Sequence, residues 1–155
     1  DYNLIVNTSR GSVARSISYL DEESDSISHE NNFVECLRFA FLAKKSKAAI
    51  LDLTKWSEKL ASISRDQQKD FLSYCSYLIR EAMLISYSSK NLGSFSSNTD
   101  FKIDKLSPFV HSSNLIEIIS LIEDCHYSIS RNVNSKIVFT NFAITLTKLI
   151  NKEEV

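Results

Sequence analysis

Apolar residues recur along this chain three or four positions apart, which is the spacing of an amphipathic α-helix and not the alternation of a half-buried strand. The helical segments predicted from this spacing are residues 12–20, 31–45, 50–63 and 66–87, a segment beginning at 113 or 114, and a last segment after 135. Only two glycines and one proline interrupt the 155 residues, so the helices are expected to be long. The chain is therefore expected to be all-α: a compact bundle of about five helices preceded by a short helical piece.

The segment 66–87 is the longest predicted helix. Ser64 and Gln67 form a capping box in front of it, in which the serine oxygen accepts a hydrogen bond from the Gln67 amide. Two neighbouring apolar stripes run along the helix: Phe71, Cys75, Leu78, Ala82 and Ile85, and beside them Leu72, Ile79 and Met83. Such a wide apolar arc predicts burial against more than one neighbour.

Three shorter stretches connect the helices. Residues 90–100 are rich in serine and asparagine and are expected to form a loop. Apolar residues surround Pro108 in 101–110, which predicts a short docked turn or a 3₁₀ segment. Residues 132–135 predict a tight corner, because asparagine tolerates left-handed geometry and asparagine and serine cap helices well. The helix that follows carries Val138, Phe139, Phe142, Leu146, Leu149 and Ile150 as its core face.

The best candidate for a domain boundary is the acidic segment 21–26, which is expected to end the first helix as a solvated linker. The residues before it resemble the inside of a domain, and the chain is expected to be a piece of a longer protein. The predicted division is therefore 1–25, the end of one domain with its linker, and 26–155, a helical domain.

The net charge of −1 argues against a broad nucleic-acid-binding surface, which would carry an excess of lysine and arginine. A smaller patch made of Arg10, Arg15 and the cluster Lys44–Lys47 could still contact phosphate. A helical nucleic-acid-binding domain is therefore an alternative interpretation. Because few aromatic residues lie among these cations, solvated or helix-capping lysines are the favoured interpretation.

No arrangement for catalysis, metal binding or cofactor binding is found in the sequence. Cys36, Cys75 and Cys125 lie far apart, without metal-binding spacing, and each lies in an apolar pattern that predicts a buried thiol in a reducing cytoplasm. The histidines form no HExxH pattern, and no glycine-rich phosphate-binding loop is present. No apolar run approaches the ~20 residues of a membrane span. We expect a non-enzymatic cytoplasmic protein that holds no cofactor.

A surplus of apolar and aromatic residues remains after the core stripes are assigned. Tyr74, Tyr77 and Leu84 lie largely off the main stripe of the long helix. Either these residues complete a generous core, or they form a protein–protein interface, since tyrosine combines apolar area with a polar tip.

Three segments together resemble one family, the delta-prime subunits of the bacterial DNA polymerase III clamp loader. Residues 9–15, SRGSVAR, are similar to the last lid helix of a clamp-loader ATPase (AAA+) module. Residues 71–81, with FLSY followed by LIRE, are similar to the family's long collar helix. Residues 132–139, NVNSKIVF, are similar to the corner before its final helix, which usually reads N-x-N-x-K.

The resemblance implies that 26–155 is a collar domain and that 1–25 ends the AAA+ lid. In a clamp loader, five collar domains form a ring that holds the motors, which load the sliding clamp on primed DNA during replication. The implied partners are the delta and gamma/tau subunits, with DNA contacted only through the whole complex. The residues expected at the interface are the off-stripe Tyr74, Tyr77 and Leu84 on the long helix, and Asn132, Asn134 and Lys136 at the corner.

The first motif also bears on which subunit the chain resembles. Motor subunits read Gly-Ser-x-Arg, with the arginine on the nucleotide, whereas this chain has Ala14 at that position. Arg15 follows one residue later, about 100° around the helix. This departure favours delta-prime over the same domain of a gamma or tau subunit, which is the second alternative.

Overall fold

The computed structural model describes residues 13–87, 99 and 101–153, and among these it contains helices and no strand. The α-helices are α2 (Val13–Leu42), α3 (Ala48–Ala61), α4 (Arg65–Tyr87), α5 (Leu115–Ser130) and α6 (Ser135–Ile150), with two 3₁₀ segments, η1 (Ile103–Lys105) and η2 (Ser107–Phe109), between α4 and α5. The all-α prediction is confirmed. The predicted 90–100 loop lies outside the described residues, except for Thr99.

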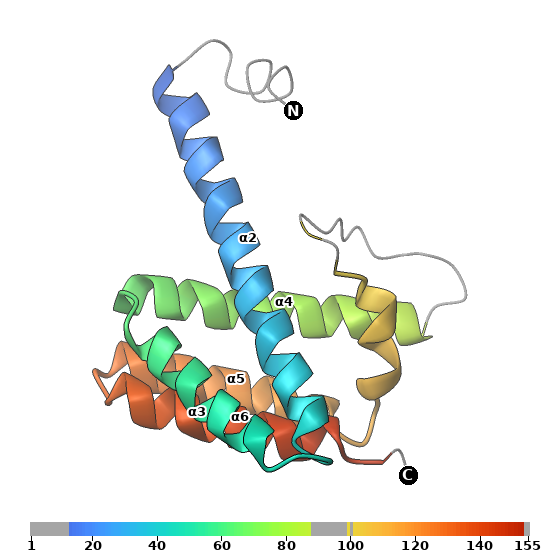
Figure 1. The fold of residues 1–155 in the computed structure, drawn as a ribbon. Helices are drawn as coiled ribbons and strands as arrows, with labels where there is room; N and C mark the ends of the chain where they lie inside the picture. Colours follow the sequence, from blue (N-terminus) through green and yellow to red (C-terminus); the bar gives the residue numbers. More distant parts are fainter. Residues whose placement is uncertain (1–12, 88–98, 100, 154–155) are drawn as a thin grey trace.

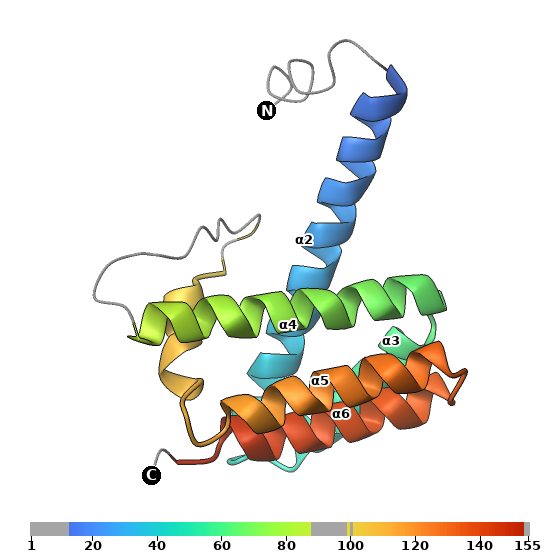
Figure 2. The same ribbon diagram turned by 180° about the vertical axis from the view of Figure 1, so that it is seen from behind.

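The helices pack as a bundle that α2 crosses. Helix α4 packs on α5, and α3 packs on α6, which is distant from it in sequence. The consecutive helices α5 and α6 also pack on each other. The second half of α2 contacts α3, α4 and α6, and its first half extends beyond the bundle (Figures 1 and 2).

The predicted end of the first helix at 21–26 is wrong, because α2 continues through this segment without a break. Its acidic residues are solvated as expected: Asp21, Glu22 and Asp25 are exposed. A run of charged and serine residues favours a loop only where a helix breaker accompanies it, and no glycine or proline lies between positions 13 and 42. The two helices expected in 12–20 and 31–45 are therefore one.

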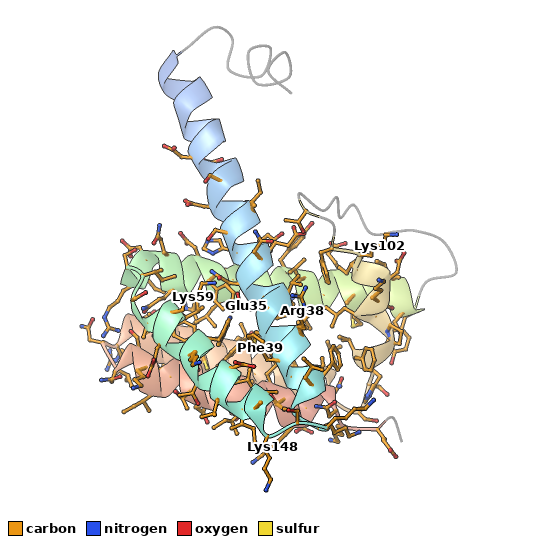
Figure 3. The ribbon with its side chains drawn as sticks, viewed as in Figure 1. Glu35, Arg38, Phe39, Lys59, Lys102 and Lys148 are labelled. Atoms are coloured by element: carbon orange, nitrogen blue, oxygen red, sulfur yellow. The ribbon has the colours of Figure 1, made fainter. Side chains whose placement is uncertain are left out.

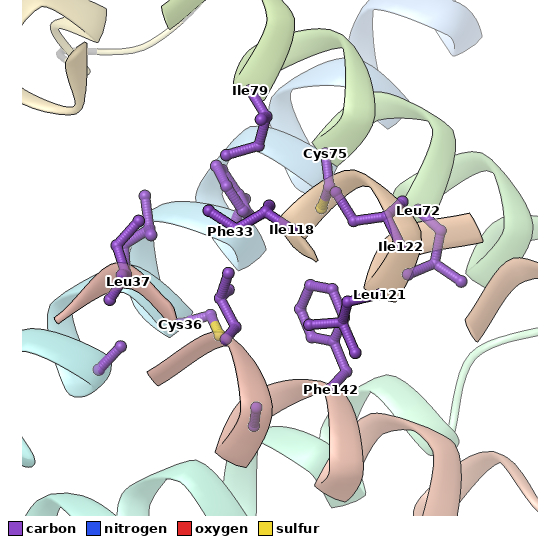
Figure 4. Packing of buried hydrophobic residues seen from close by; sticks show 14 of the residues in the cluster. Phe33, Cys36, Leu37, Leu72, Cys75, Ile79, Ile118, Leu121, Ile122 and Phe142 are labelled. Atoms are coloured by element: carbon purple, nitrogen blue, oxygen red, sulfur yellow. The ribbon is translucent and has the colours of Figure 1, made fainter. Parts of the chain in front are cut away.

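The centre of the bundle is an aromatic cluster contributed by three helices. The rings of Trp56 and Phe142 stack at 5.9 Å between centroids, and Phe71 lies 5.9 Å from the Trp56 ring. Phe139 completes the cluster at 6.1 Å from both Trp56 and Phe71. Around it, apolar side chains of α2, α4 and α5 fill the remaining space, and those labelled in Figure 4 are Phe33, Cys36, Leu37, Leu72, Cys75, Ile79, Ile118, Leu121 and Ile122.

The predicted core faces of α4 and α6 are confirmed. In α3, the apolar spacing predicts a core face of Ile50, Leu53, Trp56, Leu60 and Ile63, and this face is confirmed except at Ile50. The buried positions of α3 begin at Ala49 and continue at Leu53, Trp56 and Leu60, and Ile50 is 53% exposed. The prediction that Ile50 lies in the core is therefore wrong. Four consecutive apolar residues begin this helix, so spacing alone left its orientation open.

The predicted connections are confirmed where they are described. The Gln67 amide donates to the Ser64 hydroxyl oxygen at 3.2 Å, which is the expected helix cap. The segment around Pro108 is 3₁₀-helical, and it buries Ile103, Leu106 and Val110.

Asn132 forms the α5–α6 corner with a φ of 61°, in the left-handed region. We expect Asn132→Ala to lower the free energy of unfolding by about 1 kcal/mol, because a Cβ without a polar group is disfavoured there. Asn132→Gly should stay within about 0.5 kcal/mol of the wild type. Urea unfolding followed by circular dichroism measures both, with the exposed α6 residue Asn141→Ala as control. Equal losses for the glycine and alanine variants would contradict a role for the backbone angle.

Candidate protein–protein interface

The outer face of α4 carries the tyrosine and leucine residues singled out from the sequence. Tyr77 is 40% exposed and Leu84 is 39% exposed, and their spacing of seven residues places them two turns apart on one face. The Tyr74 ring lies 6.0 Å from the Tyr77 ring, centroid to centroid, and is half-buried. The three side chains therefore form a partly exposed apolar strip along the helix.

Tyr74 is anchored inside the molecule rather than presented to solvent. Its hydroxyl donates to Oε2 of Glu30 at 3.1 Å, and Glu30 is fully buried and also accepts from the Thr99 hydroxyl. Burial, with the Glu30 carboxylate second, raises the pKa of Tyr74 well above its ordinary value. The Tyr74 hydroxyl consequently links α4 to α2, and the exposed part of the strip is Tyr77 and Leu84.

The three corner residues each have a role within the chain. Asn132 takes the left-handed conformation, and Asn134 caps α6 by accepting from the amides of Lys136 and Ile137 at 3.0 and 3.3 Å. Lys136 forms an ion pair with Glu58 of α3 at 3.0 Å. The N-x-N-x-K pattern therefore has an architectural explanation, and its contact with a partner stays a prediction.

The structure does not bring all six predicted interface residues into one site. Arg65, at the start of α4, donates from Nη1 to the carbonyl oxygens of Ile129 and Val133 at 3.2 and 3.0 Å, which holds the corner against that end of the helix. Leu84 lies 19 residues further along α4, about 28 Å away at 1.5 Å per residue. The corner and the α4 strip are thus separate places on the surface.

The cations of the nucleic-acid alternative are also only partly placed. Lys44, Lys45 and Lys47 are exposed in the turn between α2 and α3. Arg10 lies outside the described residues, and Arg15 is in the first turn of α2. The alternative therefore stays a prediction, with the lysine cluster as its described part.

The titratable residues weighed for chemistry are packed into the fold. His29 is buried between the rings of Phe71 and Tyr74, and this burial lowers its pKa, against the raising effects of Asp25 and then Asp70. All three cysteines are buried thiols, and burial raises the pKa of Cys125 to about 12. Within the described ranges, no group of three or more histidine, cysteine and acidic residues could hold a metal ion.

Sequence reasoning missed the apolar residues that lie on the surface of α3 and α6. Ile50, Leu51 and Ile144 are 53%, 66% and 47% exposed. In α6 a signal was present, because Ile137 and Ile144 lie seven residues apart and off the core face, so they share a second apolar side. In α3 there was no such signal, because four consecutive apolar residues begin the helix and spacing does not show which of them face solvent.

None of the described helices combines the length and apolar character needed to cross a membrane. Comparison of the chain with protein-family models, with curated proteins and with solved structures finds no match.

Proposed function

We propose that this chain is the collar domain of a clamp-loader delta-prime subunit, which acts by packing against neighbouring subunits while clamp loading is driven by others. The fold offers what such a domain requires: an α-helical bundle whose core is complete without a partner and whose surface keeps partly exposed apolar side chains. Tyr77 and Leu84 on α4 are the exposed part of the first expected interface.

The observation that carries the proposal is that two of the three family-like segments pack on each other. Phe71, from the FLSY segment, lies 6.1 Å from Phe139, at the end of the NVNSKIVF segment, centroid to centroid. Arg65, six residues before FLSY on the same helix, donates to the Val133 carbonyl within the corner. Segments about 60 residues apart in sequence thus form one structural unit. The two resemblances therefore fall on a single packed region of the fold.

The third family-like segment, residues 9–15, supports the non-motor assignment through its sequence. Position 14, where a motor subunit carries the nucleotide-contacting arginine, is alanine. Delta-prime is therefore favoured over a gamma or tau subunit, and residues 1–25 are proposed to end the lid.

The test is assembly of the protein that contains this chain with delta and gamma/tau subunits from the same organism. Tyr77→Asp combined with Leu84→Asp should weaken assembly roughly tenfold or more, because two carboxylates would be desolvated at the interface. Tyr74 is left unchanged, since an aspartate there would face the buried Glu30 carboxylate and disturb the fold. Analytical size exclusion of the mixed subunits measures the loss.

The control is Ile116→Asp, which adds the same charge at an apolar residue of α5 that is 76% exposed. The proposal expects this control to assemble like the wild type and both variants to keep the wild-type thermal midpoint. Failure of the wild-type protein to join these subunits would contradict the proposed function.

A further inference from the structure

A groove between α3 and α6 forms an apolar hollow on the described surface that lies apart from the α4 strip. Its volume is about 300 Å³, and its lining includes Ile50, Leu53, Ala143, Ile144 and Lys148. The α3 positions 50, 53, 54 and 57 and the α6 positions 140, 143, 144 and 147 repeat the same i, i+3, i+4, i+7 pattern. Two matched helical rows therefore flank a valley two turns long, with small residues between the exposed Ile50 and Ile144.

One end of this groove is positively charged. The ion pair of Lys136 with Glu58 joins the start of α6 to the last turn of α3, so the two helices are antiparallel and the end of α6 lies beside the start of α3. Lys148 is therefore on the same side as the exposed lysines 44, 45 and 47, and Figure 3 shows it extending away from the bundle beside the start of α3.

These four lysines have little acidic compensation. Over the part of the chain that the structure describes, none of them forms an ion pair with a carboxylate. The acidic residues nearby are Asp52, half-buried on α3, and Glu153, which lines a neighbouring hollow together with Lys44 and Lys152. A partner that brings carboxylates to this end would thus meet cations without displacing existing pairs.

We infer that the α3–α6 groove is a second docking surface, and that it takes an amphipathic helix with an apolar stripe and acidic residues at one end. A valley between two helices accepts a third helix whose anchors recur at i, i+3 or i+4, and i+7. The groove is two helical turns long, which is the length over which three such anchors recur. The lysines then set the orientation of the incoming helix. Its acidic end lies beside the α2–α3 turn, because in the reverse orientation its carboxylates would lie away from the lysines and lose the attraction to them.

The inference rests on the proposed function for the owner of that helix, which is a neighbouring clamp-loader subunit. A member of a ring contacts one neighbour on each side, through two different surfaces. The α4 strip supplies one, and the groove, built from helices that lie on another side of the bundle, supplies the other (Figures 1 and 2).

The experiment uses the assembled complex and Ile144→Asp, which places a carboxylate in the apolar valley. We expect roughly tenfold weaker binding to one neighbouring subunit, with the other neighbour retained. Lys148→Glu should slow association with that same neighbour and reduce its salt dependence. The matched control is Ile137→Asp, two turns away on the same side of α6 and 65% exposed but outside the groove, which should bind as the wild type does.

A photo-crosslinking amino acid at Thr54, an exposed residue of α3 that lines the groove, identifies the occupant. The inference is supported if the cross-link joins an acidic amphipathic helix of the neighbour and is lost in the Ile144→Asp variant. Full assembly of the Ile144→Asp variant, or a cross-link to a basic or non-helical segment or to a second copy of this chain, overturns it while the proposed function stands. If the wild-type protein joins no clamp-loader subunit, the proposed function fails and the inference fails with it.

Discussion

Phe142→Ala is expected to lower the free energy of unfolding by about 3–5 kcal/mol, a large part of the ~5–15 kcal/mol available to a domain. Phe142 is fully buried and its ring contacts those of Trp56, Phe71 and Phe139, with centroids 5.9, 6.4 and 6.5 Å away. Helices α3, α4 and α6 all contribute to this cluster, so the cavity cannot be closed by moving one of them. Its cost therefore combines lost burial with an unfilled space.

Urea unfolding measures this effect with two signals, the circular dichroism of the helices and the fluorescence of Trp56, the single tryptophan. Ile137→Ala, on the same helix but 65% exposed, is the matched control and should change stability by less than about 1 kcal/mol. A loss for Phe142→Ala no larger than that of the control would show that the aromatic cluster is not the centre of the core.

Gln68→Leu is expected to cost about 2–3 kcal/mol although it replaces a polar residue by an apolar one of similar size. Gln68 is 1% exposed, and its Nε2 donates to the carbonyl oxygens of Leu60 and Ile63, each at 3.0 Å. Its Oε1 accepts from the Ser135 hydroxyl at 2.9 Å, so one amide joins the α3–α4 connection to the start of α6. The leucine variant would leave these buried groups without partners.

Gln67→Leu provides a control of the same residue type one position away, on an exposed part of the same turn. Gln67 takes part in the helix cap only through its backbone amide, which donates to the Ser64 hydroxyl oxygen, and the substitution keeps this amide. Unfolding experiments should therefore find the Gln67 variant within about 0.5 kcal/mol of the wild type. Similar stability of both variants would refute the structural role of the Gln68 amide.

The sequence predicted the elements whose buried face is continuous. The stripes of α4 and α6 were identified correctly because burial repeats at helical spacing over several turns, and the corner was identified because Asn132 and Asn134 have distinct backbone and capping preferences. The fusion across 21–26 was missed because an exposed helix has no apolar stripe to reveal it. There, the lack of a breaker decides the outcome.

The polar and surface features depended on tertiary packing that spacing does not encode. Gln68 lies next to a predicted cap and resembles any helical glutamine until α3 and α6 surround it. The groove arises from the relative position of two helices distant in sequence, and the exposure of Ile50 depends on which apolar residue of the first turn of α3 faces the core. For the predicted interface, the sequence located exposed Tyr77 and Leu84 but could not show that Tyr74 is tied to Glu30.

The unbroken α2 helix has a mechanical consequence. At 30 residues it is about 45 Å long, and its second half is fixed in the bundle by buried residues such as Phe33 and Leu37. A flexible tether would transmit neither torque nor bending, whereas a continuous helix keeps both the direction and the rotational phase of whatever is joined to its first turn. One residue inserted near Ser24 would turn that attachment by about 100° and advance it by about 1.5 Å, so the length of the exposed acidic stretch sets an angle as well as a distance.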